Sequence, residues 1–445
     1  MTTVSRDIQL ERIHYGTEQS EPAEIPNEVD GLSLNHGEYQ ESAVVQAAER
    51  PTKQYQILLL LSGFFMAFHV NGINSVYGIF QEFYTSEETN VVDARGQDTL
   101  VALVGTIGSG LTWSGSIFVN PLMARIDNVR MISLVGAIIM SIGLFAASFS
   151  TRMWHLYLTQ AVLYGVVGVI AAGSGVGGLV IAPVLQLLLD RYGIRWALRV
   201  LGIWNFVAGI PVSWVVKHRP GLGTRGRTRL DLRLVTSEFQ SLAAFLQAAG
   251  NIIPVYYLSS YCVAVLNYPR SMGSLLLAIN SGVNSVSRIS MGILADRIGR
   301  QNTLIAGVML SSLSVLAVWY NAPRAQFVAF TVLYGIYAGG YNALLPTTIT
   351  EIYGVQDYAS VNGFIYFIRG LGSIGGAPIA GVILGSHKRG GNAADLASQL
   401  DGHLLRKRYN DLIIYSGVLL AAAGLCVTYV RWLHARARGQ WSWKA

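Results

Sequence analysis

The sequence predicts an all-α integral membrane protein built from two halves of six helices, about twelve transmembrane spans in all. Three observations predict it. The 445 residues are 52% apolar and only 13% charged, about half the roughly 25% charge of a soluble protein. Apolar runs long enough to span a bilayer follow one another along the chain. Short motifs also recur at one offset, which is typical of duplicated transporter halves. A water-soluble domain is thereby excluded.

The N-terminal segment, residues 1–50, is acidic, with ten acids and three arginines. It lacks the apolar core of a signal peptide, and its composition predicts a disordered cytosolic tail. The rest of the chain holds 29 basic and 15 acidic residues. Its densest basic stretch, Lys217 to Arg233, lies between apolar runs. This placement favours a role in membrane orientation over nucleic-acid binding, so no nucleic-acid partner is expected.

After this tail the chain contains eleven apolar runs. Most exceed the 10–14 residues typical of buried soluble helices, so we interpret them as membrane helices. The runs are Ile57–Phe80, Thr99–Met123, Arg130–Phe149, Trp154–Leu189, Trp196–Val216, Phe239–Leu266, Met272–Ala295, Thr303–Tyr320, Ala325–Leu345, Ser360–Leu384 and Leu412–Leu433.

Two short motifs repeat along the chain. The Val-Leu-Tyr-Gly motif ending at Gly165 recurs with its last residue at Gly335, an offset of 170, and Leu122–Ile126 echoes Leu294–Ile298, an offset of 172. The first pair marks predicted helix starts and the second a short basic loop. We therefore predict two membrane halves, 52–217 and 237–435, joined by a basic cytosolic linker, 218–236, and followed by a cytosolic tail, 436–445.

The first half is shorter than the second. Gly177-Gly178 with Pro183 resembles Gly375-Gly376 with Pro378, but the two prolines differ by 195 residues, some 25 more than the other offsets. Residues 154–190 barely hold two minimal spans of ~17 residues. Either two short helices turn in the glycine-rich stretch 171–175, or one long helix replaces both and leaves eleven spans. This compression is natural or a gene-model error, and reads of the transcript around residues 165–180 would distinguish the two.

The basic residues predict the orientation of the spans. With twelve spans, both termini, the linker, Arg297 and Arg300 lie on the cytosolic side, as the positive-inside rule requires. The stretch 386–409, with five basic residues, then lies outside. We expect a multi-pass protein of the plasma membrane rather than of the vacuole or another internal membrane.

The segment Gly292–Arg300 is similar to the loop signature that major facilitator superfamily transporters carry after their second and eighth helices, and 120–130 is a looser copy. Asn74–Gln81, 173–178, Asp190–Gly193 and 254–257 resemble the monocarboxylate porter family of that superfamily, in particular its fungal members. The resemblance covers nearly everything after residue 55. It implies the major facilitator fold and transport by alternating access. It also implies conformational gating by the signature residues Arg125, Asp296, Arg297 and Arg300.

The sequence departs from that family at functional positions. An acid of the first helix is replaced by Asn71-Gly72, and the basic signature between the fourth and fifth helices falls in the compressed stretch. Arg288 matches the family arginine that pairs with the substrate carboxylate, but the proton-carrying acid one turn earlier is Asn284. The resemblance thus implies a substrate-binding arginine without its proton-carrying acid.

The few ionisable residues inside the apolar runs are candidates for a central site. An Arg at a helix centre costs about 2.5–3.5 kcal/mol on insertion scales, so such groups usually face a cavity. Arg288 either binds substrate or extends to the interface. Arg369 either binds substrate or bonds free carbonyls beside Gly370 and Gly372. His69 either relays protons, because its pKa lies near neutral, or serves packing.

Polar stripes on equivalent helices extend this site. Asn280, Asn284 and Arg288 are spaced by four and share one helix face, and Asn71 and Asn74 are three apart. We predict that both stripes, with Tyr256, line a cavity between the halves. The alternative for each Asn is a hydrogen bond between helices.

Enzyme motifs are missing from the sequence. It has no Gly-x-Ser-x-Gly motif, and none of its five lysines follows Gly, so no P-loop is present. Its two cysteines lie in apolar runs, and no cofactor or metal is expected.

We predict a secondary transporter of a small organic molecule, with membrane lipid and in one version protons as its other partners. The favoured hypothesis is efflux of an organic acid or secondary metabolite. Proton-coupled monocarboxylate uptake and a non-transporting sensor or defective transporter are the alternatives.

Overall fold

The computed structural model describes residues 53–115, 117, 129–165, 176–215, 238–385 and 397–437. The chain divides into two compact units, Met1–Arg50 and Pro51–Ala445. The predicted tail of residues 1–50, the linker 218–236 and residues 438–445 fall outside the described residues. All regular elements of the described ranges are helices. A helix satisfies its backbone polar groups internally, which a lipid environment demands.

The described helices before residue 216 belong to the predicted first half. The first apolar run is divided at Val76 into two helices, and the fourth contains a π-helical stretch. The elements are α2 (Lys53–Ser75), α3 (Tyr77–Thr85), η1 (Val92–Ala94), α4 (Asp98–Ser114), α6 (Val129–Ala147), α7 (Met153–Leu156), η2 (Tyr157–Leu163) and α9 (Val176–Val215).

The helices after residue 237 belong to the predicted second half and are longer. They are α10 (Glu238–Ala264), α11 (Arg270–Ile298), α12 (Arg300–Leu313), η5 (Ser314–Trp319), α13 (Arg324–Gly385) and α14 (Ala397–Ala437). The predicted run boundaries differ from these by several residues, because polar residues such as Arg270 and Arg324 continue a helix beyond its apolar part.

Two of the long described helices bend at glycines. Gly193 in α9 has φ of 73° and Gly354 in α13 has φ of 80°, a left-handed conformation that favours glycine because it lacks a Cβ. Each therefore divides its helix into two arms. Gly299, with φ of 98°, separates α11 from α12 in the same way.

Seven described segments are long and apolar enough to cross a membrane. One of them, Val180–Val215, contains the bend at Gly193 and supplies two passes. The pair α2 and α3, then α4, then α7 with η2, and α11 supply four more. The described residues thus hold the twelve helical passes of the predicted fold. The seven segments are Arg130–Ala147, Val180–Val215, Phe239–Ala264, Arg300–Trp319, Arg324–Gly354, Ser360–Gly385 and Leu404–Arg436.

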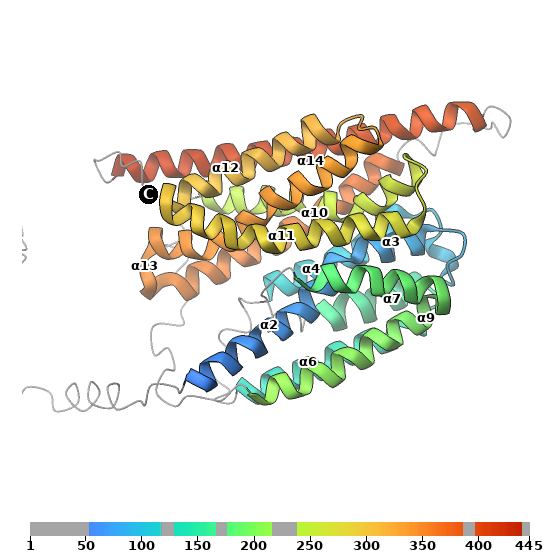
Figure 1. Cartoon of the computed structure of the whole chain (residues 1–445), viewed down its shortest axis with the longest axis horizontal. Coiled ribbons are helices and arrows are strands. Elements are labelled where there is room, and N and C mark those ends of the chain that lie inside the picture. Colours follow the sequence, from blue (N-terminus) through green and yellow to red (C-terminus); the bar gives the residue numbers. More distant parts are fainter. Residues whose placement is uncertain are drawn as a thin grey trace, which may run out of the picture. The chain divides into compact units, whose positions relative to one another are not determined.

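The compressed segment forms two short helices rather than one long one. Residues 157–165 run alongside α4 in the same direction. The Tyr157 hydroxyl donates to the Leu100 carbonyl near the start of α4, and the Gly165 carbonyl accepts from Thr112 near its end. From Val176 the first arm of α9 runs back in the opposite direction to its bend at Gly193 (Figure 1). The glycine-rich stretch predicted to contain the turn lies outside the described residues.

The repeated glycines occupy equivalent places in the two halves. A Cβ on Gly165 would lie 2.7 Å from the Gly108 carbonyl oxygen of α4, and a Cβ on Gly335 would lie 2.9 Å from the Asn280 carbonyl oxygen of α11. Both glycines therefore let one helix approach its neighbour closely. The prediction that they begin helices is wrong: Gly165 lies 12 residues after Met153, which begins α7, and Gly335 lies 11 residues after Arg324, which begins α13.

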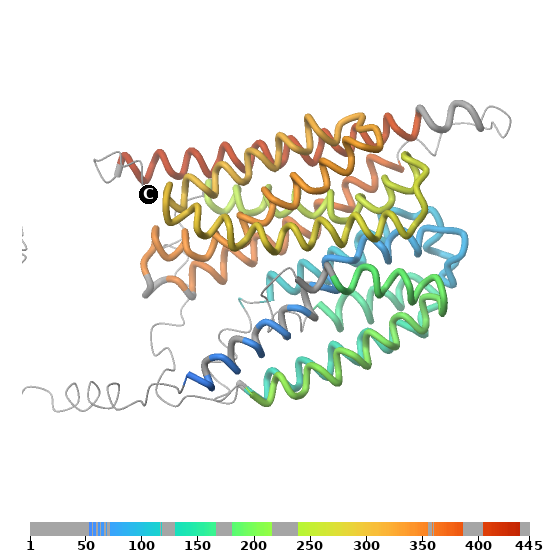
Figure 2. Tube along the Cα trace, in the orientation of Figure 1, coloured from blue at the N-terminus to red at the C-terminus, as the bar shows by residue number. Residues whose placement is uncertain are grey.

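Three helix pairs make the most extensive contacts between the described parts of the two halves. α13 packs on α4, α11 on α9, and α10 on α3. In the colours of Figure 2, the blue-to-green first half and the yellow-to-red second half separate into two groups that meet along these helices. A Cβ on Gly370 would lie 2.5 Å from the Gly110 carbonyl oxygen, so small residues permit the contact of α4 with α13.

The two ends of α11 mark the two ends of the bundle. At the Arg270 end, Arg270 of the second half donates from Nε to Glu82 of α3 at 2.9 Å and from Nη1 to Glu88 at 2.6 Å. Near the same end, a Cβ on Gly381 would lie 2.8 Å from the Thr99 Cα. The contacts between the described parts of the halves therefore extend to the Arg270 end. We call the opposite end, with the α11–α12 turn, the Gly299 end.

Candidate functional site: a cationic cavity between the halves

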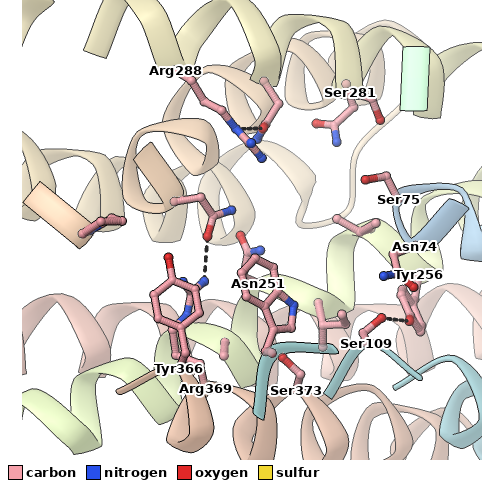
Figure 3. A pocket seen from close by; sticks show the side chains of 18 of the residues that line it. Asn74, Ser75, Ser109, Asn251, Tyr256, Ser281, Arg288, Tyr366, Arg369 and Ser373 are labelled. Carbon is pink, nitrogen blue, oxygen red and sulfur yellow. Dashed lines mark hydrogen bonds between the residues drawn. The ribbon is translucent and has the colours of Figure 1, made fainter. Parts of the chain in front are cut away.

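A cavity of about 370 Å³ lies between the two halves. Its walls come from α2, α4, α10, α11 and both arms of α13, and Figure 3 shows side chains converging on it from these helices. Most of the lining residues carry a polar or charged side chain. The lining consists of Asn74, Ser75, Ser109, Trp113, Ala248, Asn251, Ile252, Val255, Tyr256, Asn280, Ser281, Asn284, Arg288, Asn342, Pro346, Tyr358, Asn362, Tyr366, Arg369 and Ser373.

Six predicted substrate-binding residues meet in this cavity. They are Asn74, Tyr256, Asn280, Asn284, Arg288 and Arg369. The side chains of Asn71 and His69, and the whole of Arg125, fall outside the described residues. The structure thus brings Asn74 of α2 and the α11 stripe to one cavity.

The predicted gating residues lie elsewhere. Asp296, Arg297 and Arg300 are exposed at the Gly299 end, on the turn between α11 and α12. None of them lines the cavity. Their gating role stays a prediction.

The first helix ends where it meets the cavity. Asn74 and Ser75 are the last two residues of α2, and α3 begins after the break at Val76. Beyond the break, Tyr77 packs on Tyr256 with ring centroids 5.0 Å apart, and Ser109 shares a 3.0 Å hydrogen bond with the Tyr256 hydroxyl. Tyr256 is fully buried. It therefore closes the cavity toward the Arg270 end by joining the two halves.

Arg288 extends into the cavity from α11. Its Nε donates to Asn284 Oδ1 at 3.2 Å, one turn earlier. Asn284 therefore orients Arg288 without neutralising it. The side chain is half-buried and lines the cavity, which differs from the predicted alternative of an arginine extended to the interface.

Arg369 lies on α13 and is enclosed by aromatic rings. Its guanidinium carbon lies 5.0 Å from the ring centroid of Trp113, 5.1 Å from Tyr341 and 5.3 Å from Tyr366. Trp113 belongs to the first half and stacks on Tyr366 at 5.4 Å. Cation–π contacts of this kind are worth about 0.5–2 kcal/mol each. They hold Arg369 where the two halves meet.

Only neutral acceptors reach Arg369 among the described residues. Its Nη2 donates to Asn342 Oδ1 at 2.6 Å and to Gln247 Oε1 at 3.3 Å. Its Nε and Nη1 are buried and have no hydrogen-bond partner there. The predicted alternative, in which Arg369 bonds the carbonyls near Gly370, is not what the described structure shows: side-chain amides hold Arg369 instead.

The cavity is electrically positive. Arg288 and Arg369 both line it, and none of the described lining residues is Asp, Glu, His or Lys. The two charges also repel one another. A buried charge without a counter-charge costs several kcal/mol. An anion in the cavity would relieve that cost.

Two lining amides also lack partners. The Oδ1 atoms of Asn280 and Asn362 are buried and accept no hydrogen bond from a described residue. A buried acceptor left unpaired costs about 1–3 kcal/mol. Hydroxyl or amide donors on a bound molecule could pair with both.

The sequence did not predict several of the lining residues. For five lining residues the spacing was a usable signal, because residues three or four apart share one face of α13. These are Tyr358, Asn362, Tyr366, Arg369 and Ser373, of which only Arg369 was predicted. Trp113, Asn342 and Gln247, which bonds Arg369 without lining the cavity, had no such signal, because they approach Arg369 from α4, the first arm of α13 and α10.

Comparison with known proteins agrees with this architecture. The family model described as the Major Facilitator Superfamily matches residues 163–377 and 240–440, which together span more than half of the chain. The MFS-type transporter pynF of Aspergillus niger is 24% identical over 359 residues, covering 74% of this chain and 81% of that protein. The agnestins efflux protein AgnL12 of Paecilomyces divaricatus is 23% identical over 357 residues, with the same coverage of 74% and 81%.

Solved structures show the same fold. A bacterial homologue of the human lysosomal transporter Spinster, in an inward-facing and unoccupied conformation, has a TM-score of 0.64 at 14% identity, covering 88% of this chain and all of that one. The nucleoside transporter NupG has a TM-score of 0.60 at 13% identity, covering 83% and 98%. At these identities the likeness shows the fold alone. The family model, which matches more than half of the chain, establishes that this chain belongs to the major facilitator superfamily, and the twelve helical passes and the central cavity agree with it.

Proposed function

We propose that this transporter exports an organic anion, an organic acid or an acidic secondary metabolite, by alternating access about the central cavity. One observation carries the proposal: two arginines and no described acid line a cavity between the halves. Arg288 would bind an acidic group of the substrate through charge-assisted hydrogen bonds. Membrane lipid surrounds the bundle, and the apolar faces of its helices suit that solvent.

The size of the cavity favours a substrate larger than a short monocarboxylate. Its volume of about 370 Å³ falls within the roughly 300–1,000 Å³ of sites for drug-sized molecules. Water occupies about 30 Å³ per molecule in the liquid, so a three-carbon acid would leave most of the cavity filled with water. An organic product with several rings would fill it.

The direction of transport is supported by the placement of charge. If the basic linker 218–236 and Arg297 mark the cytosolic side, the Gly299 end faces the cytosol and the Arg270 end faces outward. The halves are joined by described contacts at the Arg270 end. The cavity would then receive its substrate from the cytosol, as an exporter requires. The name of one relative, the agnestins efflux protein, supports the same direction.

Transport in inside-out membrane vesicles tests this function. Labelled benzoate and lactate serve as probes, each with and without a pH gradient. We expect wild-type vesicles to accumulate benzoate, and Arg288→Gln to lower the rate at least tenfold, about 1.4 kcal/mol of binding. Arg152→Gln, an exposed position remote from the cavity, is the matched control. Unchanged transport by Arg288→Gln would remove the substrate role of Arg288.

The same assay separates the alternatives. Proton-coupled monocarboxylate uptake, which the resemblance to the monocarboxylate porters favours, predicts lactate transport that depends on the gradient. The presence of Asn284 where that family has an acid argues against it. A sensor or defective transporter predicts no transport of either probe. We place the protein in the plasma membrane with both termini in the cytosol, since an exporter acts there.

A further inference from the structure

We infer that the substrate carries two acidic groups, one bound by Arg288 and the other by Arg369 on the opposite wall. This inference rests on the proposed function, because it specifies the anion that the cavity would carry. Figure 3 shows the two side chains entering the cavity from different walls, α11 and α13. The two positions differ in exposure, in partners and in surroundings.

Arg288 offers an open position. Only its Nε has a hydrogen-bond partner among the described residues, Asn284 Oδ1. The two Nη groups remain for a ligand, and together they form a fork that matches both oxygens of a carboxylate. Because the side chain is half-buried, an acidic group can reach this fork with little rearrangement.

Arg369 offers an enclosed position. Only 3% of its surface is exposed, and a guanidinium has five N–H donors. The amide oxygens of Asn342 and Gln247 accept from Nη2, which leaves Nε and Nη1 unpaired. The enclosing rings attract the cation but accept no strong hydrogen bond. Arg369 is therefore an unneutralised charge with unfilled donors beside a cavity.

The second acidic group would enter this position by replacing one amide. Nε–H and one Nη2–H point the same way and form the side-on fork of a guanidinium. A carboxylate that displaces Asn342 Oδ1 from Nη2 would gain Nε as well. It would exchange one hydrogen bond from Arg369 to a neutral amide for two bonds to a carboxylate, in which both donor and acceptor are charged.

A substrate with one charge cannot satisfy both positions. Trp113, Tyr341 and Tyr366 enclose Arg369, while Asn284 holds Arg288 on the opposite wall (Figure 3). A group bonded to Arg369 would therefore lie among the rings, across the cavity from Arg288. A monoanion would leave one arginine uncompensated, and a dianion neutralises both.

Ligand-dependent thermal unfolding of the purified full-length protein tests the inference. The probes are three dicarboxylates of different length, malonate, glutarate and terephthalate, each compared with its monomethyl ester at pH 7.5. The ester keeps the shape and removes one charge. Ligands that bind only the native state raise its stability in proportion to the logarithm of concentration over Kd. We expect at least one diacid to bind tenfold or more tightly than its ester.

Two variants assign that preference to Arg369. Arg369→Gln should reduce the ratio of the diacid and ester affinities to near one while the ester still binds through Arg288. Asn342→Asp supplies an internal counter-charge beside Nη2 and keeps the arginine, so it should remove the preference even if Arg369→Gln fails to fold. The control Asn342→Ser, which adds no charge, should keep it.

The outcomes separate this inference from the proposed function. If the wild type prefers no diacid over its ester, or if Asn342→Asp keeps the preference, the two-group substrate is wrong. In that case ester binding that depends on Arg288 would still leave organic-anion transport in place. If neither acids nor esters bind and vesicles transport no probe, the proposed function itself fails.

Discussion

Arg369 shows how a single residue can carry both structure and function in this protein. It contacts Trp113 of the first half and Tyr341 and Tyr366 of the second, so it joins the halves through aromatic rings. It also brings a positive charge to the cavity without a described acid to neutralise it. This is the combination expected where binding of an anion is coupled to relative movement of the halves.

Gly370, the next residue, supports a prediction about packing. A methyl group there would lie 2.5 Å from the Gly110 carbonyl oxygen and 2.8 Å from the Ser114 nitrogen, both backbone atoms of α4. We expect Gly370→Ala to separate α4 from α13, to destabilise the protein by about 1–3 kcal/mol and to lower transport in vesicles severalfold. Thermal unfolding and benzoate uptake measure the two effects.

Gly375 of the same helix provides the control. A Cβ there meets only the Ile379 side chain, at 4.0 Å, so Gly375→Ala should be neutral or stabilise by up to about 1 kcal/mol. Equal behaviour of the two alanine variants would show that close contact of α4 with α13 is not required.

At the scale of elements, described contacts join the two halves at the Arg270 end, where we expect a gate. Arg270, which begins α11, bridges the buried Glu82 of α3 and the exposed Glu88. Exposed ion pairs contribute about 0–1 kcal/mol, whereas removing one partner of a buried bridge costs more because it leaves a buried charge unpaired. In an alternating-access cycle this bridge has to break when the cavity opens toward that end.

We predict that Arg270→Gln shifts the protein toward a state open at the Arg270 end. Spin labels at Val92 and Tyr320, both exposed and on opposite halves, report the separation in a background with Cys262→Ala and Cys426→Ala. The distance distribution should gain a longer component in Arg270→Gln. Arg95→Gln is the control, because Arg95 pairs at 3.8 Å with Glu87 within one half. Identical distributions in both variants would argue against the gate.

At the scale of the whole molecule, the twelve helical passes determine the sidedness of the loops. Two short helices replace the single long helix that the compressed stretch also allowed, so the number of passes is even. The Arg270 end and the Gly299 end face opposite sides of the membrane because α11 crosses it. Seven passes separate the loop 86–97 from the α11–α12 turn, so these two loops also lie on opposite sides.

Labelling with a membrane-impermeant maleimide tests this topology in intact cells. In the cysteine-free background, Val92→Cys should react from outside, and Arg300→Cys should react only after permeabilisation. Epitope tags at both termini should behave as Arg300→Cys does. Labelling of both cysteines from outside would contradict the arrangement, and accessible tags would contradict the proposed orientation.

Much of the fold and part of the site follow from the sequence because they depend on local periodicity. Apolar runs predict spans, since a helix in lipid pairs its own backbone polar groups. Asn280, Asn284 and Arg288 share a face because four residues make about one helical turn. The helix ends were less predictable, because polar residues such as Arg270 extend a helix out of the apolar layer.

The sequence by itself determined the class of the protein, its spans and the polar stripe of α11. Only the tertiary structure decided that Trp113, Gln247 and Asn342, from three helices, surround Arg369, and that Arg288 faces it across one cavity. The physical reason is that a stripe depends on neighbours along one helix. The cavity instead depends on which helices meet, and close contacts at small residues such as Gly370 determine that.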